Sequence, residues 1–467
     1  MIAFSPRLTT AALIAMISCA AQAVPSQTQT STTTYDVAGR VSQVVDGMLH
    51  MTKFDYDALS RQSTVTDHKN GITRYRYDLL GQLIEVTDAR LVVTGYTIDG
   101  LGNLKQTLSS DTGQTNNDYD EAGNLTSTTD AKQQRTTYKY DVLNRLELVT
   151  HHDNTTVAYL YDQGANAIGK LSKITDASGT IEYGYDAFGR ITSETRTIGG
   201  ASYLNGYRYD NAGRFSGMRY PTGRDIEFVR DALGRISGIT TVVGGAVQSL
   251  VSNVAYQPFG PVQKVTFGNG QSQTRTFDLD GRIASFSLPS QLMGLTYDAA
   301  SRITAITDAA SAAASTSYGY DDLDRLTNVS TPSSAQVYEY DAVGNRKQKL
   351  NNSAVTTYGY AGAGNRLTQV GSQAIAMDAN GSITNKGNAT FNYDVRGRMV
   401  SATTTIGLVQ YTINSLGQRV RKTTPTETTV FHYDMAGKLI AESTSVGGAS
   451  KVQEYVYLGD VPVAVLR

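Results

Sequence analysis

One short motif recurs along almost the whole sequence at nearly constant spacing. Its fullest copies read Tyr-Asp-x-x-Gly-Arg, and seven successive aspartates lie 21 residues apart. These are Asp36, Asp57, Asp78, Asp99, Asp120, Asp141 and Asp162, and the series continues with looser spacing to Asp434. A chain made from one repeated supersecondary unit folds as an array of stacked units, in which each unit buries its apolar face against the next.

The chemistry of the motif predicts a β-hairpin. An aromatic residue recurs two positions before the motif tyrosine, and this period of two is typical of a strand with both rings on one face. The aspartate accepts backbone N–H bonds that open a turn. The glycine supplies the left-handed conformation that closes a three-residue loop with a bulge. The predicted structural residues include Tyr35, Asp36, Gly39 and Arg40; Tyr185, Asp186, Gly189 and Arg190; and Tyr209, Asp210, Gly213 and Arg214.

The strand that follows the motif carries apolar residues five and eight positions after the aspartate, for example Val41 and Val44. Three steps along a regular strand place two side chains on opposite faces, and a bulge would place them on the same face. The sequence leaves both arrangements open. Four irregular stretches are predicted to be longer loops: Gly164–Gly169, Gly199–Gly206, Gly244–Gln257 and Ala309–Ser317.

These features predict an all-β fold of tandem hairpins, about twenty units spanning residues 33–467, after a short segment at 24–32. Because an isolated hairpin is only marginally stable, each unit must pack on its neighbours. Residues 1–23 are predicted to be a cleaved signal peptide, since the apolar run Ala11–Ala21 is too short to span a bilayer and Ala21-Gln22-Ala23 suits signal peptidase. A lipoprotein attached through Cys19 is the minor alternative. Either reading places the protein outside the cytoplasm, secreted or in the cell envelope.

Composition excludes several classes of function. The 41 Lys+Arg and 42 Asp+Glu give a net charge of -1, so the chain lacks the basic excess of a nucleic-acid-binding protein. No other stretch has the length of a membrane-spanning segment. We find no nucleophile elbow, phosphate-binding loop or zinc-protease motif, and we therefore predict a protein that is not an enzyme, with no catalytic residues and no cofactor.

Two short patterns suggest metal binding and are set aside. His151-His152-Asp153 contains the one adjacent histidine pair, but adjacent strand residues point to opposite faces, and a solvated turn is the simpler reading. Asp278-x-Asp280-Gly281 begins like a calcium loop and lacks the later acidic ligand. No metal site is predicted.

The motif side chains are interpreted as scaffold, because a residue present in every unit does not mark a single active site. Arginines such as Arg40, Arg190, Arg214, Arg235 and Arg398 are expected to pair with carboxylates or stack on tyrosine rings. Four of the 29 tyrosines are taken to lie outside the paired pattern, and they are candidates for stacking against sugar rings at the surface. These are Tyr96, Tyr203, Tyr220 and Tyr256.

The tandem units, from Thr33 to Arg467, resemble the YD repeats of the bacterial rearrangement-hotspot (RHS) family, which are shared with teneurins and with shell subunits of insecticidal toxin complexes. The segment Tyr455–Val465 is similar to the family's stretch shortly before its core-terminal region. The resemblance implies repeats that spiral into an elongated or partial hollow β-shell. It also implies a C-terminal or separately encoded effector as a partner. The sequence reaches Arg467 without the family's terminal protease motif or an effector, so toxin activity is not implied directly.

The expected function is a non-catalytic, exported shell or scaffold in a toxin-encapsulating or cell-surface interaction system. The alternative is a carbohydrate-binding adhesive protein, with cell-surface glycans as partners.

Overall fold

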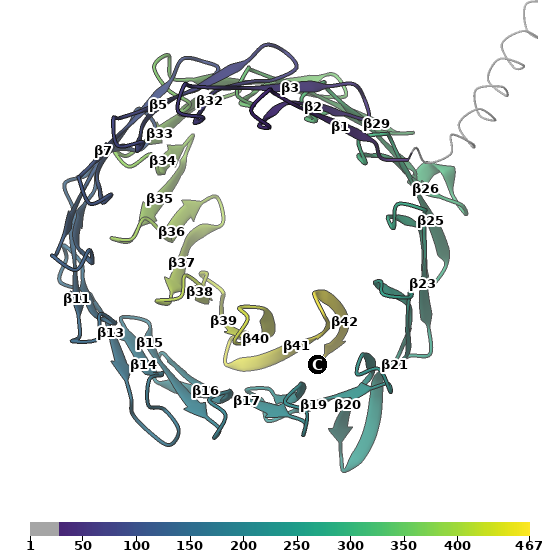
Figure 1. Cartoon of the computed structure of the whole chain (residues 1–467). Helices are drawn as coiled ribbons and strands as arrows, with labels where there is room; N and C mark the ends of the chain where they lie inside the picture. The colour runs from purple at the N-terminus through teal and green to yellow at the C-terminus, as the bar shows by residue number, and fades with distance from the viewer. Residues whose placement is uncertain (1–27) are drawn as a thin grey trace, which may run out of the picture. The chain divides into compact units, whose positions relative to one another are not determined.

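Nearly every residue that the structure describes lies in a β-strand or in a turn between two strands. The computed structural model describes residues 28–467, which contain 42 strands and one single-turn 3-10 helix, η1 (Ala312–Ala314). Strands adjacent in the sequence pair antiparallel (Figure 1). The predicted all-β fold of tandem hairpins is confirmed. The predicted signal peptide, Cys19 included, lies outside the described residues.

The described residues form two compact units. Unit 1 comprises residues 28–74 together with Gln273–Thr356, and unit 2 comprises Tyr75–Ser272 together with Thr357–Arg467. Strands β5 (Ile72–Tyr77), β23 (Ser272–Phe277) and β31 (Ala354–Tyr360) cross the boundaries. The other strands of unit 1 are β1 (Ser31–Tyr35), β2 (Val41–Asp46), β3 (Met51–Tyr56), β4 (Gln62–Thr66), β24 (Ile283–Leu288), β25 (Gln291–Tyr297), β26 (Ile303–Asp308), β27 (Thr316–Tyr320), β28 (Leu326–Thr331), β29 (Ser334–Tyr340) and β30 (Arg346–Asn351).

Unit 2 holds two runs of strands. The first run is β6 (Leu83–Thr87), β7 (Val93–Ile98), β8 (Leu104–Ser109), β9 (Gly113–Tyr119), β10 (Leu125–Thr129), β11 (Arg135–Tyr140), β12 (Leu146–Thr150), β13 (Thr156–Tyr161), β14 (Leu171–Asp176), β15 (Gly179–Tyr185), β16 (Ile191–Ile198), β17 (Ala201–Tyr209), β18 (Phe215–Arg219), β19 (Asp225–Arg230), β20 (Ile236–Val243), β21 (Ala246–Tyr256) and β22 (Val262–Phe267). The second run is β32 (Leu367–Val370), β33 (Gln373–Met377), β34 (Ile383–Lys386), β35 (Ala389–Tyr393), β36 (Met399–Thr404), β37 (Gly407–Ile413), β38 (Arg419–Thr423), β39 (Glu427–Tyr433), β40 (Leu439–Val446), β41 (Ala449–Leu458) and β42 (Val461–Leu466).

Each motif forms the predicted turn. In the hairpin β1–β2 the Gly39 N–H donates to the Asp36 carbonyl at 3.0 Å and the Asp36 N–H donates to the Arg40 carbonyl at 2.8 Å. Gly39 has φ +77, and Gly189 and Gly213 have φ +76 and +78. This is a three-residue loop closed by a left-handed glycine, as the motif predicts.

A β-bulge determines on which face of the returning strand its apolar side chains lie. Tyr35 pairs with Val41 and Thr33 pairs with Val44, with a register shift between them. Tyr35 and Thr33 lie two residues apart on one face of β1, so their partners Val41 and Val44 also share that face. The same shift recurs in β11–β12, where Tyr140 pairs with Leu146 and Tyr138 with Val149. The apolar residues at positions five and eight therefore join the tyrosines on one face.

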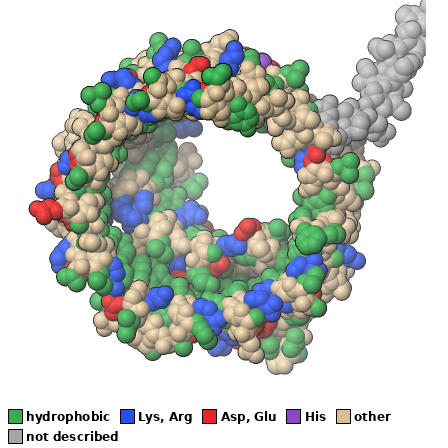
Figure 2. Space-filling model, in the orientation of Figure 1, with side chains coloured by type: hydrophobic (Ala, Val, Ile, Leu, Met, Phe, Trp, Pro, Cys, Tyr) green, Lys and Arg blue, Asp and Glu red, His purple; other side chains and the backbone are tan. Residues whose placement is uncertain are grey.

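The two faces of each sheet differ in burial. Along β11 the exposed side chains alternate with half-buried ones, and Tyr138 and Tyr140 lie on the half-buried face. On the visible surface, Lys/Arg and Asp/Glu side chains are interspersed and form no large patch of one sign, in keeping with the near-zero net charge (Figure 2).

The largest apolar core lies in unit 2, where strands of the second run pack on strands of the first. Ile226 of β19 and Ile239 of β20 are fully buried in the same cluster as Ile440 of β40 and Val456 of β41. Figure 1 shows β40 and β41 beside β17 and β19. A smaller cluster joins Val149 and Val157 with Ile174 and Ile181.

Two of the four predicted loops are wrong. Residues 199–206 belong mostly to β17 and residues 244–257 mostly to β21, because the glycine pairs Gly199-Gly200 and Gly244-Gly245 form tight turns between longer strands. The other two stretches connect strands as predicted: residues 164–169 lie between β13 and β14, and residues 309–315 contain η1.

Candidate functional site

The motif side chains form one contact set that is repeated from hairpin to hairpin. The Asp36 Oδ1 accepts the backbone N–H groups of Ala38 and Arg40, both at 2.9 Å. Its Oδ2 accepts the Arg40 guanidinium at 2.7 Å, and that guanidinium lies 4.5 Å from the centre of the Tyr56 ring in the next hairpin. Aspartate orders its own turn, and arginine links that turn to the following unit through an ion pair and a cation–π contact.

The motif arginines make ion pairs and ring contacts of this kind in many hairpins. Each predicted arginine pairs with the aspartate four residues earlier, as in Arg40, Arg190, Arg214, Arg235 and Arg398. Stacking on a tyrosine recurs at 4.4–5.0 Å in the pairs Arg145–Tyr161, Arg190–Tyr209, Arg235–Tyr256, Arg282–Tyr297, Arg302–Tyr320 and Arg325–Tyr340.

The motif tyrosine links each hairpin to the preceding one. The Tyr56 hydroxyl donates to the Val41 carbonyl at 2.8 Å, and Tyr185 and Tyr209 donate in the same way to the carbonyls of Leu171 and Ile191. Tyr35 lies in the first described strand and is exposed. The motif side chains are thus used in contacts between neighbouring hairpins.

The four tyrosines proposed as sugar-stacking platforms are not exposed rings. Tyr220 is wrong as a surface candidate, since its side chain is only 3% exposed within the core of unit 2. Tyr256 is a motif tyrosine in a turn where Gln257 replaces aspartate, and its hydroxyl donates to the Ile236 carbonyl at 2.8 Å. Tyr96 is half-buried in β7. Tyr203 is half-buried, with its ring centre 4.5 Å from that of His432.

Polar contacts join the two runs of strands in unit 2 along a seam. From the first run the seam includes β16–β19 and their turns. From the second run it includes β39–β41 and the turn before β38. Tyr220 donates its hydroxyl to the Tyr455 carbonyl at 2.9 Å, and Asn205 donates to the Tyr433 carbonyl at 2.8 Å. The carboxylate of Glu454 accepts hydrogen bonds from both Thr222 and Arg224. These bonds join segments more than 200 residues apart in the chain.

The seam also contains the most strongly perturbed titratable groups. Glu194 is buried and pairs with Arg196, which in turn donates to Gln418 at 2.7 Å. Burial raises the pKa of Glu194, and the guanidinium opposes that rise. Burial, reinforced by the charge of Arg196, lowers the pKa of His432 to about 4. Each shift follows from packing between strands, so none marks a reaction centre by itself.

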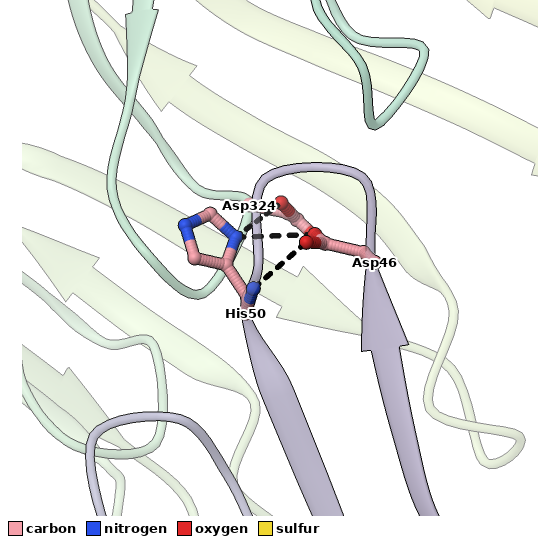
Figure 3. A group of neighbouring side chains, drawn as sticks. All are labelled: Asp46, His50 and Asp324. Carbon is pink, nitrogen blue, oxygen red and sulfur yellow. Dashed lines mark hydrogen bonds and ion pairs between the residues drawn. The ribbon is translucent and has the colours of Figure 1, made fainter. Parts of the chain in front are cut away.

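A different kind of cluster lies in unit 1, where histidine meets carboxylates from distant parts of the chain. The turn between β2 and β3 carries Asp46 and His50, and the turn between β27 and β28 carries Asp324 (Figure 3). The His50 Nδ1 lies 3.1 Å from the Asp46 Oδ2 and 3.8 Å from the Asp324 Oδ1. Asp322 lies on the other side of the ring, with its Oδ1 3.8 Å from the His50 Nε2.

These side chains line an open cavity of about 460 Å³ together with Asp67 and His68. The His68 ring centre is 5.1 Å from that of His50, and its Nδ1 accepts the Met51 N–H at 3.0 Å. Within residues 28–467, one group of at least three His, Cys, Asp or Glu side chains has ligand atoms that all lie within 4.8 Å of one another. This group consists of Asp46, His50 and Asp324.

The sequence analysis did not identify this cluster, because its members come together only in the folded unit. One local signal was available: His50 stands four residues after Asp46, and the equivalent residues one and two repeats later, Gly71 and Val92, have no metal-ligating side chain. The two patterns that were considered lie elsewhere. His151 and His152 fall at a turn as expected, although His151 is buried rather than solvated. Asp278 and Asp280 both pair with Arg282, and Asp280 also accepts the Gln29 N–H.

No described helix is long and apolar enough to cross a membrane. The sequence profile of the teneurin YD-shell matches residues 8–167 and 291–434, which is more than half of the chain, and an RHS repeat profile matches residues 166–202. Among curated proteins no match was found.

Solved structures with a similar fold come from toxin complexes. The Photorhabdus luminescens Tc holotoxin pore (mutation TccC3-D651A) aligns with a TM-score of 0.75 and 17% identity over 91% of this chain. The TcdB2-TccC3 crystal structure gives the same values, and the TcdB2-TccC3-Cdc42 structure gives 0.74 and 17%. This chain spans only 27–28% of the length of those proteins. At this identity the likeness shows the fold.

Proposed function

The chain belongs to the teneurin YD-shell family, and on that premise we propose that it is a structural shell of the RHS type, exported and without catalytic activity, that encloses or supports an effector polypeptide. One observation carries the proposal: the recurring Asp, Arg and Tyr side chains are engaged in contacts between neighbouring hairpins. The Arg190 guanidinium, for example, pairs with Asp186 and lies 4.4 Å from the Tyr209 ring. Such side chains support a wall and supply no single reactive centre.

The partner is proposed by analogy of fold. One of the structures that share this fold contains TcdB2 together with TccC3, and another is a Tc holotoxin pore with a mutation in TccC3. By the same architecture, a polypeptide encoded after Arg467 or by a neighbouring gene would be the cargo of this chain. A carbohydrate-binding role is less well supported, because Tyr220 is buried and Tyr256 is engaged within its repeat.

Protease protection tests the shell. An unstructured peptide carrying an epitope and several trypsin sites would be fused after Arg467, and the same peptide would be fused to a compact globular carrier as a control. We expect the epitope to survive trypsin much longer on the shell protein than on the carrier. Equal rates of cleavage would contradict enclosure. A glycan array on the same protein is expected to give no strong hit, and a specific hit would favour the adhesive alternative.

Export is tested separately. The full-length chain would be expressed in a bacterium, and the protein recovered from the periplasm or medium would be sequenced from its N-terminus. Cleavage after Ala23 predicts a product that begins at Val24. A product that retains Met1, or one lipidated at Cys19, would contradict the proposed secretory signal peptide.

A further inference from the structure

Two turns of unit 1 depart from the repeat at the positions that meet in the Asp46 cluster. In the equivalent turns one and two repeats later, which start at Asp67 and Asp88, the fourth residue after the aspartate is Gly71 or Val92. The corresponding residue after Asp46 is His50. In the turn that starts at Asp321, the position usually held by glycine is Asp324, which has φ +60. An imidazole and a carboxylate thus stand at positions where these turns usually carry neither group.

The distances suit a small metal ion. Zinc bonds of 2.0–2.2 Å to histidine nitrogen and carboxylate oxygen in a tetrahedral arrangement place neighbouring ligand atoms about 3.3–3.5 Å apart. The His50 Nδ1 and Asp46 Oδ2 are 3.1 Å apart, and the His50 Nδ1 and Asp324 Oδ1 are 3.8 Å apart. Shifts of a few tenths of an ångström would bring each of these oxygens to a tetrahedral separation from the His50 nitrogen, and all three ligand atoms already lie within 4.8 Å of one another. Water would complete the coordination, because the Asp324 side chain is 57% exposed.

Neighbouring groups help to orient two of the ligands. The Asp46 Oδ1 accepts the backbone N–H groups of Met48 and His50, both at 2.8 Å, so that Oδ2 faces the imidazole. On the far side of the ring the Asp322 carboxylate lies near Nε2, where the N–H of a metal-bound imidazole would point. A carboxylate behind a metal-binding histidine is a common way to fix the tautomer and raise the basicity of the ligand.

The local charge favours a cation. The cavity is lined by four carboxylates, those of Asp46, Asp67, Asp322 and Asp324. Lys69 offsets part of this charge, with its amine 3.4 Å from Asp322. The Arg302 guanidinium contacts Asp324 Oδ1 at 2.6 Å, but it also pairs with Asp298 at 2.7 Å and so is shared between two carboxylates. An excess of negative charge remains, and a dication would reduce the repulsion.

We propose that Asp46, His50 and Asp324 bind a divalent transition-metal ion, with zinc as the best match to one imidazole and two carboxylates. The ion would join the β2–β3 turn to the β27–β28 turn and so fasten two distant segments of unit 1 together. The proposal does not depend on what the shell encloses.

Isothermal titration with zinc chloride tests the site. The protein would be purified without a histidine tag, stripped with EDTA and titrated beside two variants that restore the repeat. His50→Gln places next to Asp46 the residue type that Gln134 supplies in the equivalent turn after Asp130, and Asp324→Gly places glycine at a left-handed position, so both variants should fold. Asn144→Gly is the matched control, since Asn144 has φ +59 in a turn outside the cluster.

We expect one zinc ion per wild-type chain and a rise in melting temperature on binding, because a ligand that binds only the folded state stabilises it. Each repeat-restoring variant should lose affinity by at least about tenfold and lose the thermal shift, whereas Asn144→Gly should keep both. Calcium should bind much more weakly, since it selects oxygen ligands. The proposal is overturned if zinc does not saturate a single site, if the variants bind as the wild type does, or if calcium binds at least as tightly as zinc.

Discussion

The hydroxyl of Tyr220 donates a 2.9 Å hydrogen bond to the backbone carbonyl of Tyr455, 235 residues further along the chain. Tyr220 stands where most turns have aspartate: its carbonyl accepts the Gly223 N–H and its own N–H donates to the Arg224 carbonyl. Its ring packs in the core between the two runs of strands in unit 2. Burial raises the pKa of this phenol, so it stays a neutral donor.

Replacing Tyr220 with phenylalanine tests the seam. The ring would still fill its place, but the Tyr455 carbonyl would lose its partner, and an unpaired buried polar group costs about 1–3 kcal/mol. Tyr220→Ala should cost about 3–5 kcal/mol because it also leaves a cavity. Urea unfolding followed by circular dichroism measures both. Tyr96→Phe, at a half-buried ring in β7, is the control and should change stability little. Equal effects of Tyr220→Phe and Tyr96→Phe would contradict the role given to the seam.

Turn glycines should tolerate substitution less well than strand glycines. Gly397 has φ +72 and an added Cβ would meet nothing within 4 Å, so a change to valine isolates backbone strain from crowding. A β-branched residue in this conformation should cost about 1–3 kcal/mol. Gly95 of β7 is the matched control, with space around it and an ordinary backbone. Thermal melts should show a clear loss for Gly397→Val and almost none for Gly95→Val. The reverse order would refute the turn assignment.

The hairpins could be predicted from the sequence because their determinants are local. All contacts that shape the turn of Asp36, Gly39 and Arg40 fall within five consecutive residues. The aromatic period of two and the position of the apolar residues are likewise visible within one unit. The face of Val44 required the bulge beside Val41, which the sequence allowed without requiring it.

Contacts between hairpins that are far apart in the sequence could not be predicted in the same way. Tyr220 looks like an unpaired aromatic in the sequence, and only the approach of β41 makes it a core residue. The contact between His50 and Asp324 could not be predicted either, since nothing in the sequence near Asp324 indicates that the β2–β3 turn lies beside it. The repeat specifies which atoms each hairpin presents, whereas the packing of hairpins far apart in the sequence determines which of them meet.

The aspartate turns should make the protein sensitive to acid. Hydrogen bonds from the side chain four residues later, donated by Arg40, Arg61 and Asn124, are the main reason that the pKa values of Asp36, Asp57 and Asp120 lie below their usual range. A carboxylate with a lowered folded-state pKa contributes stability above its unfolded pKa of about 3.9, and this contribution is lost as pH falls through the folded value. Many such turns titrate together, so the loss should be steep.

Urea midpoints measured from pH 5 to pH 2 test this expectation. The wild type should lose stability progressively below about pH 4. Asp57→Asn keeps a turn-forming acceptor without the charge, so its stability should fall less over the same range. Glu194 acts in the opposite sense, because its raised pKa favours the folded state once it is protonated. A midpoint that stays constant from pH 5 to pH 2 would be incompatible with the charged turns shown here.

His432 should govern stability at milder pH. Its ring packs on Tyr203 and its Nε2 lies 3.2 Å from the Ser443 hydroxyl, deep in the seam. The folded-state pKa is lowered from 6.5 to about 4, so between these values the unfolded chain binds the proton and the folded chain does not. Stability must therefore fall as pH drops from about 6.5 to about 4, by roughly 3 kcal/mol in total.

His432→Phe keeps a ring against Tyr203 and removes the titration, so the slope of unfolding free energy against pH should flatten in this window. Part of the slope should remain, because burial also lowers the pKa of His151. An unchanged slope in His432→Phe would show that this ring is not the titrating group.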